Sequence, residues 1–549
     1  MRTGRIFEEI EQRPACIVGS IMNDGKEQAG AFPPDRGRVD SAGARMSLTS
    51  AGDRLARFVD RRLALVLPLW LAAFLAAMIP LASRPLWYDE LFTYYEATAS
   101  DLHQAYGRLI HTDANPPLEY LLVRGSIALF GDSPLAVRIP SVAAFLCASV
   151  ALFAVVRKRL GTVYGLTALG FLWSTGFVYY AAEARSYALL LAFFSIAMAC
   201  WLRAVGKGRM TWVHGGLSAS LAGMLLSHCF AVASIGAFIL GQVVHDVRAR
   251  RADRSSWIAL VLPLPAVTLY LPFIRTVKSV IYPPAFQASW RSFADAYWTP
   301  FGPVFLLLLI VLLFLPRQPG GVTLRELVAP DEMAFVAGTL LVQVPIVLAL
   351  MWAKVAFWPR YGIVSALGVS LLLTFLVAYK SNRAPWAGVL AAVLLLGNFC
   401  AVHHILGEKP ERLSTAYREI LPELPFVAAS GLTFMEMDHR EPAGFVSRLH
   451  YLTDREAATR YAHATIFETF PVLQQWFPIR ATVEPYREFV LQHGCFLVIA
   501  TPGYPEDWLL DKLKDDGAEL RLLGREVTGY KDRDLFLVSL KGANCPRTP

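Results

Sequence analysis

The sequence predicts a mostly α-helical protein that crosses a membrane about eleven times and ends in a small α/β domain. Three observations support this fold class. Hydrophobic residues make up 55% of the 549 residues and charged residues only 17%, below the quarter typical of soluble domains. The segment 61–407 holds only 26 Lys/Arg and 14 Asp/Glu, whereas the much shorter segment 408–549 holds 17 and 21. Long uncharged runs separate the charges of the first segment, which excludes a conventional soluble enzyme.

The uncharged runs are long enough to cross a bilayer, because its core of about 30 Å needs about 20 residues in helical form. The first of them, at 63–82, contains no charged residue. Their boundaries are expected to be accurate to a few residues. The eleven predicted spans lie at 63–82, 139–156, 162–182, 186–202, 210–227, 229–244, 256–274, 300–315, 333–353, 361–379 and 385–404.

The Lys and Arg residues of the connecting loops predict the orientation, because cytoplasmic loops are enriched in them. With the N-terminus inside, the inside loops hold 16 basic and five acidic residues, and the outside loops hold 10 and nine. The net charge of +8 therefore reflects membrane topology and does not indicate a nucleic-acid partner. We expect a multi-pass protein of the plasma or inner membrane, with a cytoplasmic N-terminus and an extracytoplasmic C-terminal domain.

Two regions flank the membrane domain of residues 61–407. Residues 1–60 lack sustained periodicity and are expected to form a disordered cytoplasmic tail. Residues 408–549 combine helical patterns near 411–428 and 505–517 with strand-like runs at 495–501 and 534–540, which predict a small α/β domain. Cys495 opens one of these runs and Cys545 follows the other, so a disulfide and two separate thiols both remain open.

The first outer loop, at 83–138, is long for a connection. It holds seven of the 14 acidic residues of the membrane region, together with several aromatic residues. Its apolar residues predict short helices along the membrane surface, near 90–106 and 117–130. This composition indicates a functional loop.

Three polar sequences reach the same outer face by this topology. They are "WYDE" at 87–90, "EARSY" at 183–187 and "FWPRY" at 357–361, the last with Lys354 just before it. Carboxylates and arginines that meet at one face can form a cleft, in which a carboxylate acts as general base and Arg or Lys holds an anionic group. The sequence shows no spacing typical of a metal site, and we assign no metal ligand.

Each of these polar positions also has a structural explanation. Asp89 can cap a helix that begins at Glu90. Glu183 and Arg185 can form an ion pair within their turn, and Arg360 can extend to the membrane surface as an ordinary interfacial residue. The residues alone leave both interpretations open.

Taken in order, these segments resemble the GT-C class of membrane glycosyltransferases, and within it the protein O-mannosyltransferase and lipid A aminoarabinose transferase group (glycosyltransferase families 39 and 83). The resemblance covers about 63–380. The family's Pro-Pro pair is usually preceded by His, and Asn115 stands there in this sequence. The motifs that carry the resemblance are "LWYDELFTYYEA" (86–97), "NPPLEYLL" (115–122), "FGDSPLAVRIPS" (130–141), "YYAAEARSYALLL" (179–191) and "FWPRYGI" (357–363).

The resemblance implies that 61–407 is a catalytic domain that transfers a hexose or pentose from a polyprenyl-phosphate donor. The acceptor is a hydroxyl group of lipid A, another glycan, a lipid or a protein, and a single displacement inverts the anomeric centre. Asp89 is implied as catalytic base with Glu90 as its neighbour, and Arg360 and Lys354 as ligands of the donor phosphate. No cofactor is assigned, and dependence on a divalent metal stays open. The residues implied to border the cleft are Trp87, Tyr88, Asn115, Glu183, Arg185 and Tyr187.

Two other functions are weighed against this one. A polytopic transporter is expected to carry charged residues at mid-membrane and repeated halves, whereas most central runs here are uncharged. A non-catalytic membrane scaffold of cell-envelope assembly would have no need for the long acidic loop. Both remain alternatives to a glycosyltransferase.

Overall fold

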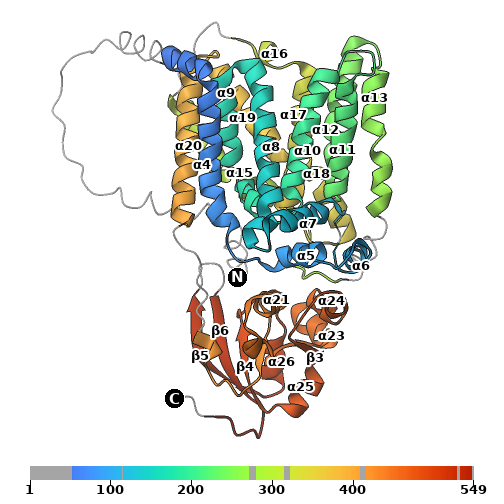
Figure 1. Ribbon diagram of the computed structural model, residues 1–549, viewed down its shortest axis with the longest axis vertical. Coiled ribbons are helices and arrows are strands. Elements are labelled where there is room, and N and C mark those ends of the chain that lie inside the picture. The colour runs from blue at the N-terminus through green and yellow to red at the C-terminus, as the bar shows by residue number, and fades with distance from the viewer. Residues whose placement is uncertain are drawn as a thin grey trace, which may run out of the picture.

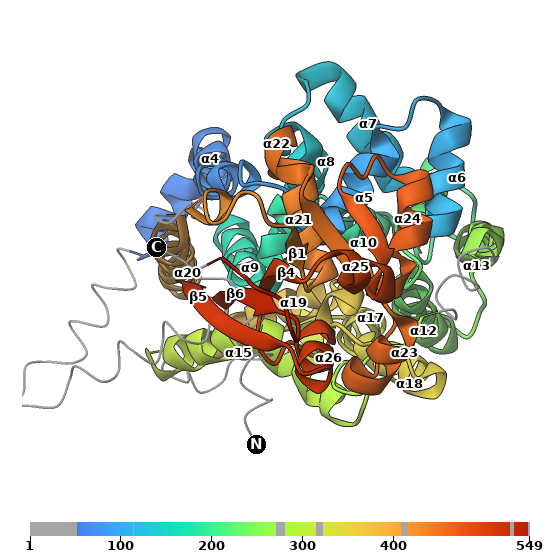
Figure 2. The same ribbon diagram turned by 90° about the horizontal axis from the view of Figure 1, so that it is seen from below.

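The structure is a computed structural model that describes residues 52–113, 115–270, 280–314, 322–407, 416–527 and 532–546. It consists of a bundle of apolar helices, short helices at one end of the bundle, and an α/β domain beyond them (Figure 1). Seen from the side of the α/β domain, this domain covers that end of the bundle (Figure 2). The predicted fold class is confirmed.

The described residues include six helical segments that are long and apolar enough to cross a membrane. Each overlaps a predicted span, although the segment that begins at Arg291 starts nine residues before the predicted span at 300–315. Prolines at 68, 80, 140, 300 and 303 lie inside these helices, as membrane helices tolerate. The helices are α4 (Leu63–Ala82), α8 (Pro134–Leu160), α10 (Tyr187–Ala204), α15 (Arg291–Phe314), α17 (Pro330–Leu340) continued by α18 (Gln343–Ala353), and α20 (Pro385–Gly407).

The other predicted spans contain helices outside these six, and all of them except the 19-residue α12 (Ala231–Ala249) are shorter or interrupted. Pro263 and Pro265 follow the end of one of them, α13, and account for its shortness because proline cannot continue the helical hydrogen bonds. The number of eleven spans therefore stays a prediction. These helices are α9 (Thr162–Trp173) with the 3-10 helix η1 (Gly176–Ala182), α11 (Trp212–Ser227), α12 (Ala231–Ala249), α13 (Arg254–Val261) with η2 (Leu264–Tyr270), and η3 (Pro359–Gly362) with α19 (Ser365–Lys380); the short α16 (Leu324–Leu327) precedes α17.

The predicted N-terminal tail is described only in its last part, since residues 1–51 lie outside the described residues. Residues 52–61 are helical, so the prediction of disorder is wrong for 52–60. The physical reason is that apolar residues recur there at helical spacing. Ala56 is buried, and Val59 packs against the core of the bundle.

The first outer loop forms the short helices that its apolar residues predict. They are α5 (Tyr88–Ala97), α6 (Leu102–Thr112) and α7 (Leu118–Phe130). Asp101 separates the first two, because its side chain accepts a hydrogen bond of 2.8 Å from the N–H of Gln104 and so caps α6. These helices lie between the bundle and the α/β domain (Figure 1).

The α/β domain is built on a six-stranded sheet of order β3-β2-β1-β4-β6-β5. Strands β3, β2, β1 and β4 run parallel, and β6 and β5 are antiparallel additions at one edge. The helical pattern expected near 505–517 corresponds to α26. The strands are β1 (Phe426–Ala428), β2 (Leu449–Thr453), β3 (Thr482–Pro485), β4 (Cys495–Ala500), β5 (Glu519–Val527) and β6 (Asp532–Ser539), and the main helices are α21 (Gly431–Arg440), α22 (Ala443–Val446), α23 (Arg455–Ala457), α24 (Phe470–Trp476), α25 (Tyr486–Gln492) and α26 (Leu509–Asp515).

The helix expected over 411–428 is wrong in its described part. Residues 411–415 lie outside the described residues, 416–418 form a single 3-10 turn, and Phe426–Ala428 is strand β1 between β2 and β4. Pro422 and Pro425 interrupt any helix there. Cys495 and Cys545 form a disulfide with their Cα atoms 5.6 Å apart, which settles the open alternative in favour of the bond.

The α/β domain docks directly on the helices of the first outer loop. The ring of Phe467 meets that of Tyr88 edge to face at 5.8 Å, and Trp476 stacks on His111 at 4.4 Å. A pair of hydrogen bonds joins Thr465 to Ile281, with the two N–H donors at 2.9 and 3.0 Å from their acceptors. One face of the sheet and α5 therefore share a single apolar core.

Candidate active site

The first turn of α5 sets the position of Asp89. The helix begins at Tyr88 with Trp87 at its N-cap, and the carboxylate of Glu90 accepts the N–H of Trp87 at 3.2 Å. Asp89 therefore lies inside the first turn and does not cap the helix. The structural explanation for Asp89 as a cap is wrong.

Asp89 meets Arg360 across the end of the bundle. Nη2 of Arg360 donates to Oδ2 of Asp89 at 3.2 Å, and the two side chains are 18% and 22% exposed. Arg360 comes from η3, 271 residues further along the chain. An ion pair that is four-fifths buried does not fit the interfacial explanation for Arg360.

Two aromatic rings contact the guanidinium of Arg360. Its Cζ lies 5.2 Å from the centre of the Trp358 ring and 5.7 Å from that of Tyr187. Such contacts position a cation without using its N–H donors. Nε of Arg360 is buried and has no hydrogen-bond partner within the described residues. The side chain thus has a donor available for an anion.

Arg185 links the backbone of α5 to a further acid, Asp113. Its Nη1 donates to Oδ2 of Asp113 at 3.0 Å and to the carbonyl of Asp89 at 3.2 Å. The structural alternative, an ion pair between Glu183 and Arg185 within their turn, is wrong, because Arg185 pairs with Asp113 instead. Asn115 joins the same group, because its Nδ2 donates to Oδ1 of Asp113 at 3.2 Å.

Glu183 lies beside this group, in the turn between two predicted spans. Burial raises the pKa of its carboxyl to about 8, against a smaller lowering by Arg360. Its Oε1 is buried without a hydrogen-bond partner in the described part of the chain. Glu183 therefore presents a carboxyl that is readily protonated near neutral pH.

Glu90 has a different environment from its neighbour Asp89. Its side chain is fully buried and forms an ion pair with Arg138 of α8, whose Nε donates to Oε1 at 2.6 Å and whose Nη2 donates to Oε2. The N–H of Ala184 donates to the same Oε1 at 2.7 Å. With these contacts and the bond from Trp87, both oxygens are occupied by the protein. The geometry favours a structural role for Glu90.

Three of the proposed residues stand apart from this cluster. The ring of Tyr88 packs against Phe92 and Phe467, towards the α/β domain, and Trp87 packs against the same core. Lys354 is exposed at the C-terminal end of α18. Its side chain makes no hydrogen bond or ion pair among the residues that the structure describes. The structure therefore brings together Asp89, Arg185 and Arg360, with Asn115, Glu183 and Tyr187 next to them.

Asp113 and Arg138 are the residues of this region that the sequence reasoning did not assign. A signal existed for each. Asp113 precedes the "NPP" motif by two positions, and Arg138 is a lone charge in the first turns of a long apolar helix. Helix α8 begins earlier than predicted because Ser133 caps it, accepting the N–H of Ala136 at 3.1 Å, and Pro134 occupies its first turn.

Comparison with known proteins agrees with this architecture. A family model described as dolichyl-phosphate-mannose-protein mannosyltransferase matches residues 114–274. The crystal structure of ArnT from Cupriavidus metallidurans bound to undecaprenyl phosphate is 12% identical, with a TM-score of 0.50, and the match covers 89% of this chain and 100% of that one. The same protein in the apo state gives 12% identity and a TM-score of 0.52, covering 86% and 97%. No curated protein matches the chain.

The family match includes α7 to α13 and the "EARSY" turn, and the structural match extends over nearly the whole chain. Several helices are long and apolar enough to span a membrane. The chain is therefore a multi-pass membrane protein with the fold of ArnT, and part of it matches the dolichyl-phosphate-mannose-protein mannosyltransferase family model.

Proposed function

We propose that the protein is an inverting glycosyltransferase that moves a sugar from a polyprenyl-phosphate donor to an acceptor hydroxyl at the outer face of the membrane. The observation that carries this proposal is the contact between Asp89 and Arg360 at the end of the bundle that bears the loop helices. This contact places Asp89, a potential base, beside Arg360, whose buried Nε–H has no hydrogen-bond partner among the described residues. ArnT, which has the same fold, was crystallised with undecaprenyl phosphate, which supports this class of donor.

The two side chains suit the two charges that develop in such a reaction. The acceptor oxygen attacks the anomeric carbon as the bond from that carbon to the phosphate oxygen breaks. The proton of the acceptor passes to the carboxylate of Asp89. The leaving polyprenyl phosphate gains negative charge, which Arg360 stabilises. No general acid is required, because a phosphate monoester leaves as an anion.

The donor phosphate and Asp89 would share Arg360. In the structure only Nη2 of Arg360 contacts Asp89, and only through Oδ2. The buried Nε–H offers a second direction from which a phosphate oxygen can be held. Leaving such a donor unpaired costs about 1–3 kcal/mol, which anion binding would recover. Arg185 supports this arrangement because it donates to the backbone carbonyl of Asp89.

The test of the base is Asp89→Asn. A panel of radiolabelled hexoses and pentoses on undecaprenyl phosphate is supplied to purified protein with envelope extract as acceptor, and transfer is measured. We expect the rate to fall by about 10²–10⁴-fold, the usual effect of losing a general base. The matched control is Asp101→Asn, a cap of α6 where Asn serves as well as Asp. Transfer at the wild-type rate by Asp89→Asn would remove Asp89 from the mechanism.

The test of the phosphate site needs neither sugar nor acceptor. Undecaprenyl phosphate itself is titrated into wild type, Asp89→Asn and Arg360→Ala, with the exposed Arg291→Ala as a control of equal charge change. We expect Arg360→Ala to weaken binding by about 10-fold or more, the value of a charge-assisted hydrogen bond. Asp89→Asn should retain binding, because it removes a competing partner of Arg360. Unchanged affinity in Arg360→Ala would contradict the assignment.

The alternatives predict different results in the same experiments. A transporter would move the lipid-linked sugar across the membrane without forming a new glycosidic bond. A scaffold would neither bind undecaprenyl phosphate through Arg360 nor transfer sugar. The finer points, namely the sugar, the acceptor and any contribution of Lys354, belong to this proposal and are addressed by the same panel.

A further inference from the structure

A cavity of about 330 Å³ lies at the opposite end of the bundle from the candidate active site. It is open on one side and lined by residues of α8, α10, α17 and α19. Its inner wall is apolar and buried, and one side of it is formed by exposed residues at the ends of α8 and α10. Its volume is within the range of ligand pockets in proteins. The wall consists of Val156, Met198, Phe335, Val336, Leu371 and Phe375.

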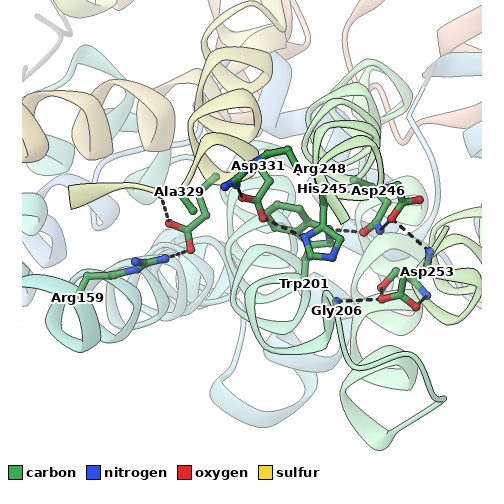
Figure 3. Close-up of polar contacts among 12 residues, drawn as sticks. Arg159, Trp201, Gly206, His245, Asp246, Arg248, Asp253, Ala329 and Asp331 are labelled. Atoms are coloured by element: carbon green, nitrogen blue, oxygen red, sulfur yellow. Dashed lines mark hydrogen bonds and ion pairs between the residues drawn. The ribbon is translucent and has the colours of Figure 1, made fainter. Parts of the chain in front are cut away.

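Three basic side chains and one acid line the exposed side of this cavity. Arg159 forms an ion pair with the acid, Glu332 (Figure 3). Lys158 makes no hydrogen bond or ion pair with any described residue, and Arg203 donates only to the carbonyl of Ala199, at 3.1 Å. Two positive charges at the opening are therefore not neutralised by the described parts of the protein.

The nearby acids are already engaged by other groups. Asp331 accepts from Arg248 at 3.2 Å and from His245 at 3.3 Å (Figure 3). Asp246 accepts the indole N–H of Trp257 at 2.7 Å, and Asp253 accepts the N–H of Gly206 at 3.0 Å. These contacts hold the ends of the helices together. The positive charges of Lys158 and Arg203 are therefore available to an anionic ligand.

We propose that this cavity binds an anionic phospholipid of the leaflet opposite the candidate active site. Lys158 and Arg203 hold its phosphate, and one acyl chain enters between Phe335, Phe375 and Val336. Basic pockets between transmembrane helices recognise anionic headgroups in this way. A soluble anion would not contact the apolar wall, and a neutral lipid would not neutralise the charges of Lys158 and Arg203. The site is separate from the transfer chemistry and does not depend on it.

The test compares lipids that differ only in the headgroup. Purified protein in a neutral detergent is titrated with dioleoyl phosphatidylglycerol or dioleoyl phosphatidylcholine, and bound lipid is counted by native mass spectrometry. One basic residue near an anionic headgroup contributes about fivefold in affinity, so two should favour phosphatidylglycerol by about 10- to 30-fold. Equal binding of the two lipids would overturn the proposal.

The variants separate the headgroup from the acyl chain. Lys158→Gln with Arg203→Gln should abolish the preference, whereas Lys207→Gln with Arg251→Gln, an equal change at exposed positions of the same end, should leave it within about twofold. Val155→Trp narrows the cavity without changing charge and should weaken both lipids. Normal lipid binding by Val155→Trp, or displacement of phosphatidylglycerol by soluble glycerol phosphate at equal concentration, would refute the lipid site even if the double variant does not fold.

Discussion

Glu90→Gln provides the sharpest test of how the two adjacent acids divide their roles. The pair of Glu90 with Arg138 is buried, with side chains 0% and 4% exposed, so solvent does not screen it. Oε1 of Glu90 accepts from Arg138 and Ala184, and Oε2 accepts from Trp87 and Arg138. A glutamine has one oxygen and one NH₂ group. Either orientation of its amide places the NH₂ against two donors.

The expected cost follows from this geometry. Removing one partner of a buried ion pair destabilises a protein by about 3–5 kcal/mol, because the remaining charge is uncompensated. Arg138 keeps backbone acceptors at Ala82 and Pro85, at 2.9 and 3.1 Å. We therefore expect the lower end of the range, about 3 kcal/mol, seen as a fall of several °C in the apparent melting temperature.

The assay is thermal denaturation in detergent at one heating rate, since unfolding of such proteins is commonly irreversible. Asp89→Asn serves as the adjacent control and should melt near wild type, because its side chain is partly exposed and forms one ion pair among the described residues. Glu90→Gln with Arg138→Met removes both charges and should recover part of the loss. If Glu90→Gln melts at the same temperature as the wild type and yet transfers no sugar, Glu90 is the base and its assignment to a structural role is wrong.

Three further predictions concern orientation, the disulfide and pH. Reporter fusions near 158, 206, 250, 320 and 382 should report cytoplasm, and those near 110, 183, 285, 357 and 480 the outside, because Lys and Arg gather in the first set of loops. Cys495 and Cys545 should appear as one linked peptide in non-reducing maps, and reduction should destabilise the α/β domain by about 4 kcal/mol for a separation of 50 residues. The pKa of Glu183 rises on folding from 4.5 to about 8, so its stabilising contribution is complete below about pH 4.5 and is lost as the pH rises to about 8. When the pH is raised from about 5 to about 9, the melting temperature of the Glu183→Gln variant should fall less than that of the wild type.

Each of these has a result that would contradict it. A cytoplasmic reporter at 480, with the N-terminus also cytoplasmic, would make the number of spans even and would remove the argument that the three polar sequences share one outer face. Free alkylation of both cysteines in the native protein would exclude the bond. Parallel pH profiles for Glu183→Gln and wild type would mean that Glu183 titrates with its ordinary pKa.

The helical architecture was predictable from the sequence because it depends on local properties. Uncharged runs and clusters of Lys and Arg are visible without knowing any contact, and the six long membrane helices overlap predicted spans. The short strand-like runs at 495–501 and 534–540 predicted β4 and β6 for the same reason. Strand β1 was missed because it has only three residues, and neighbouring strands rather than its own pattern make it extended.

For the site, the sequence predicted only that its residues lie at the same end of the bundle. Topology and the motifs brought Asp89, Arg185 and Arg360 to one face, but pairing between them depends on tertiary structure. Arg138 and Glu90 are 48 residues apart, and Arg185 and Asp113 are 72 residues apart. No periodicity specifies such partners. This is why the sequence offered only Glu183, its neighbour in the turn, as an alternative partner for Arg185, and why Glu90 was considered with Asp89 as a catalytic residue.

The contacts of Glu90 also impose an order on biosynthesis. The carboxylate that anchors α5 accepts from Ala184, 94 residues later in the chain. At about 5–20 residues per second, the ribosome needs roughly 5 to 20 s to make that stretch. In the predicted topology the first outer loop has already crossed the membrane by then. During this interval the carboxylate of Glu90 lacks the hydrogen bond from the N–H of Ala184. The loop therefore completes its fold only after the following helices are inserted, and its aromatic face stays open until the α/β domain is made. A nascent chain arrested before residue 184 should expose this loop to an added protease.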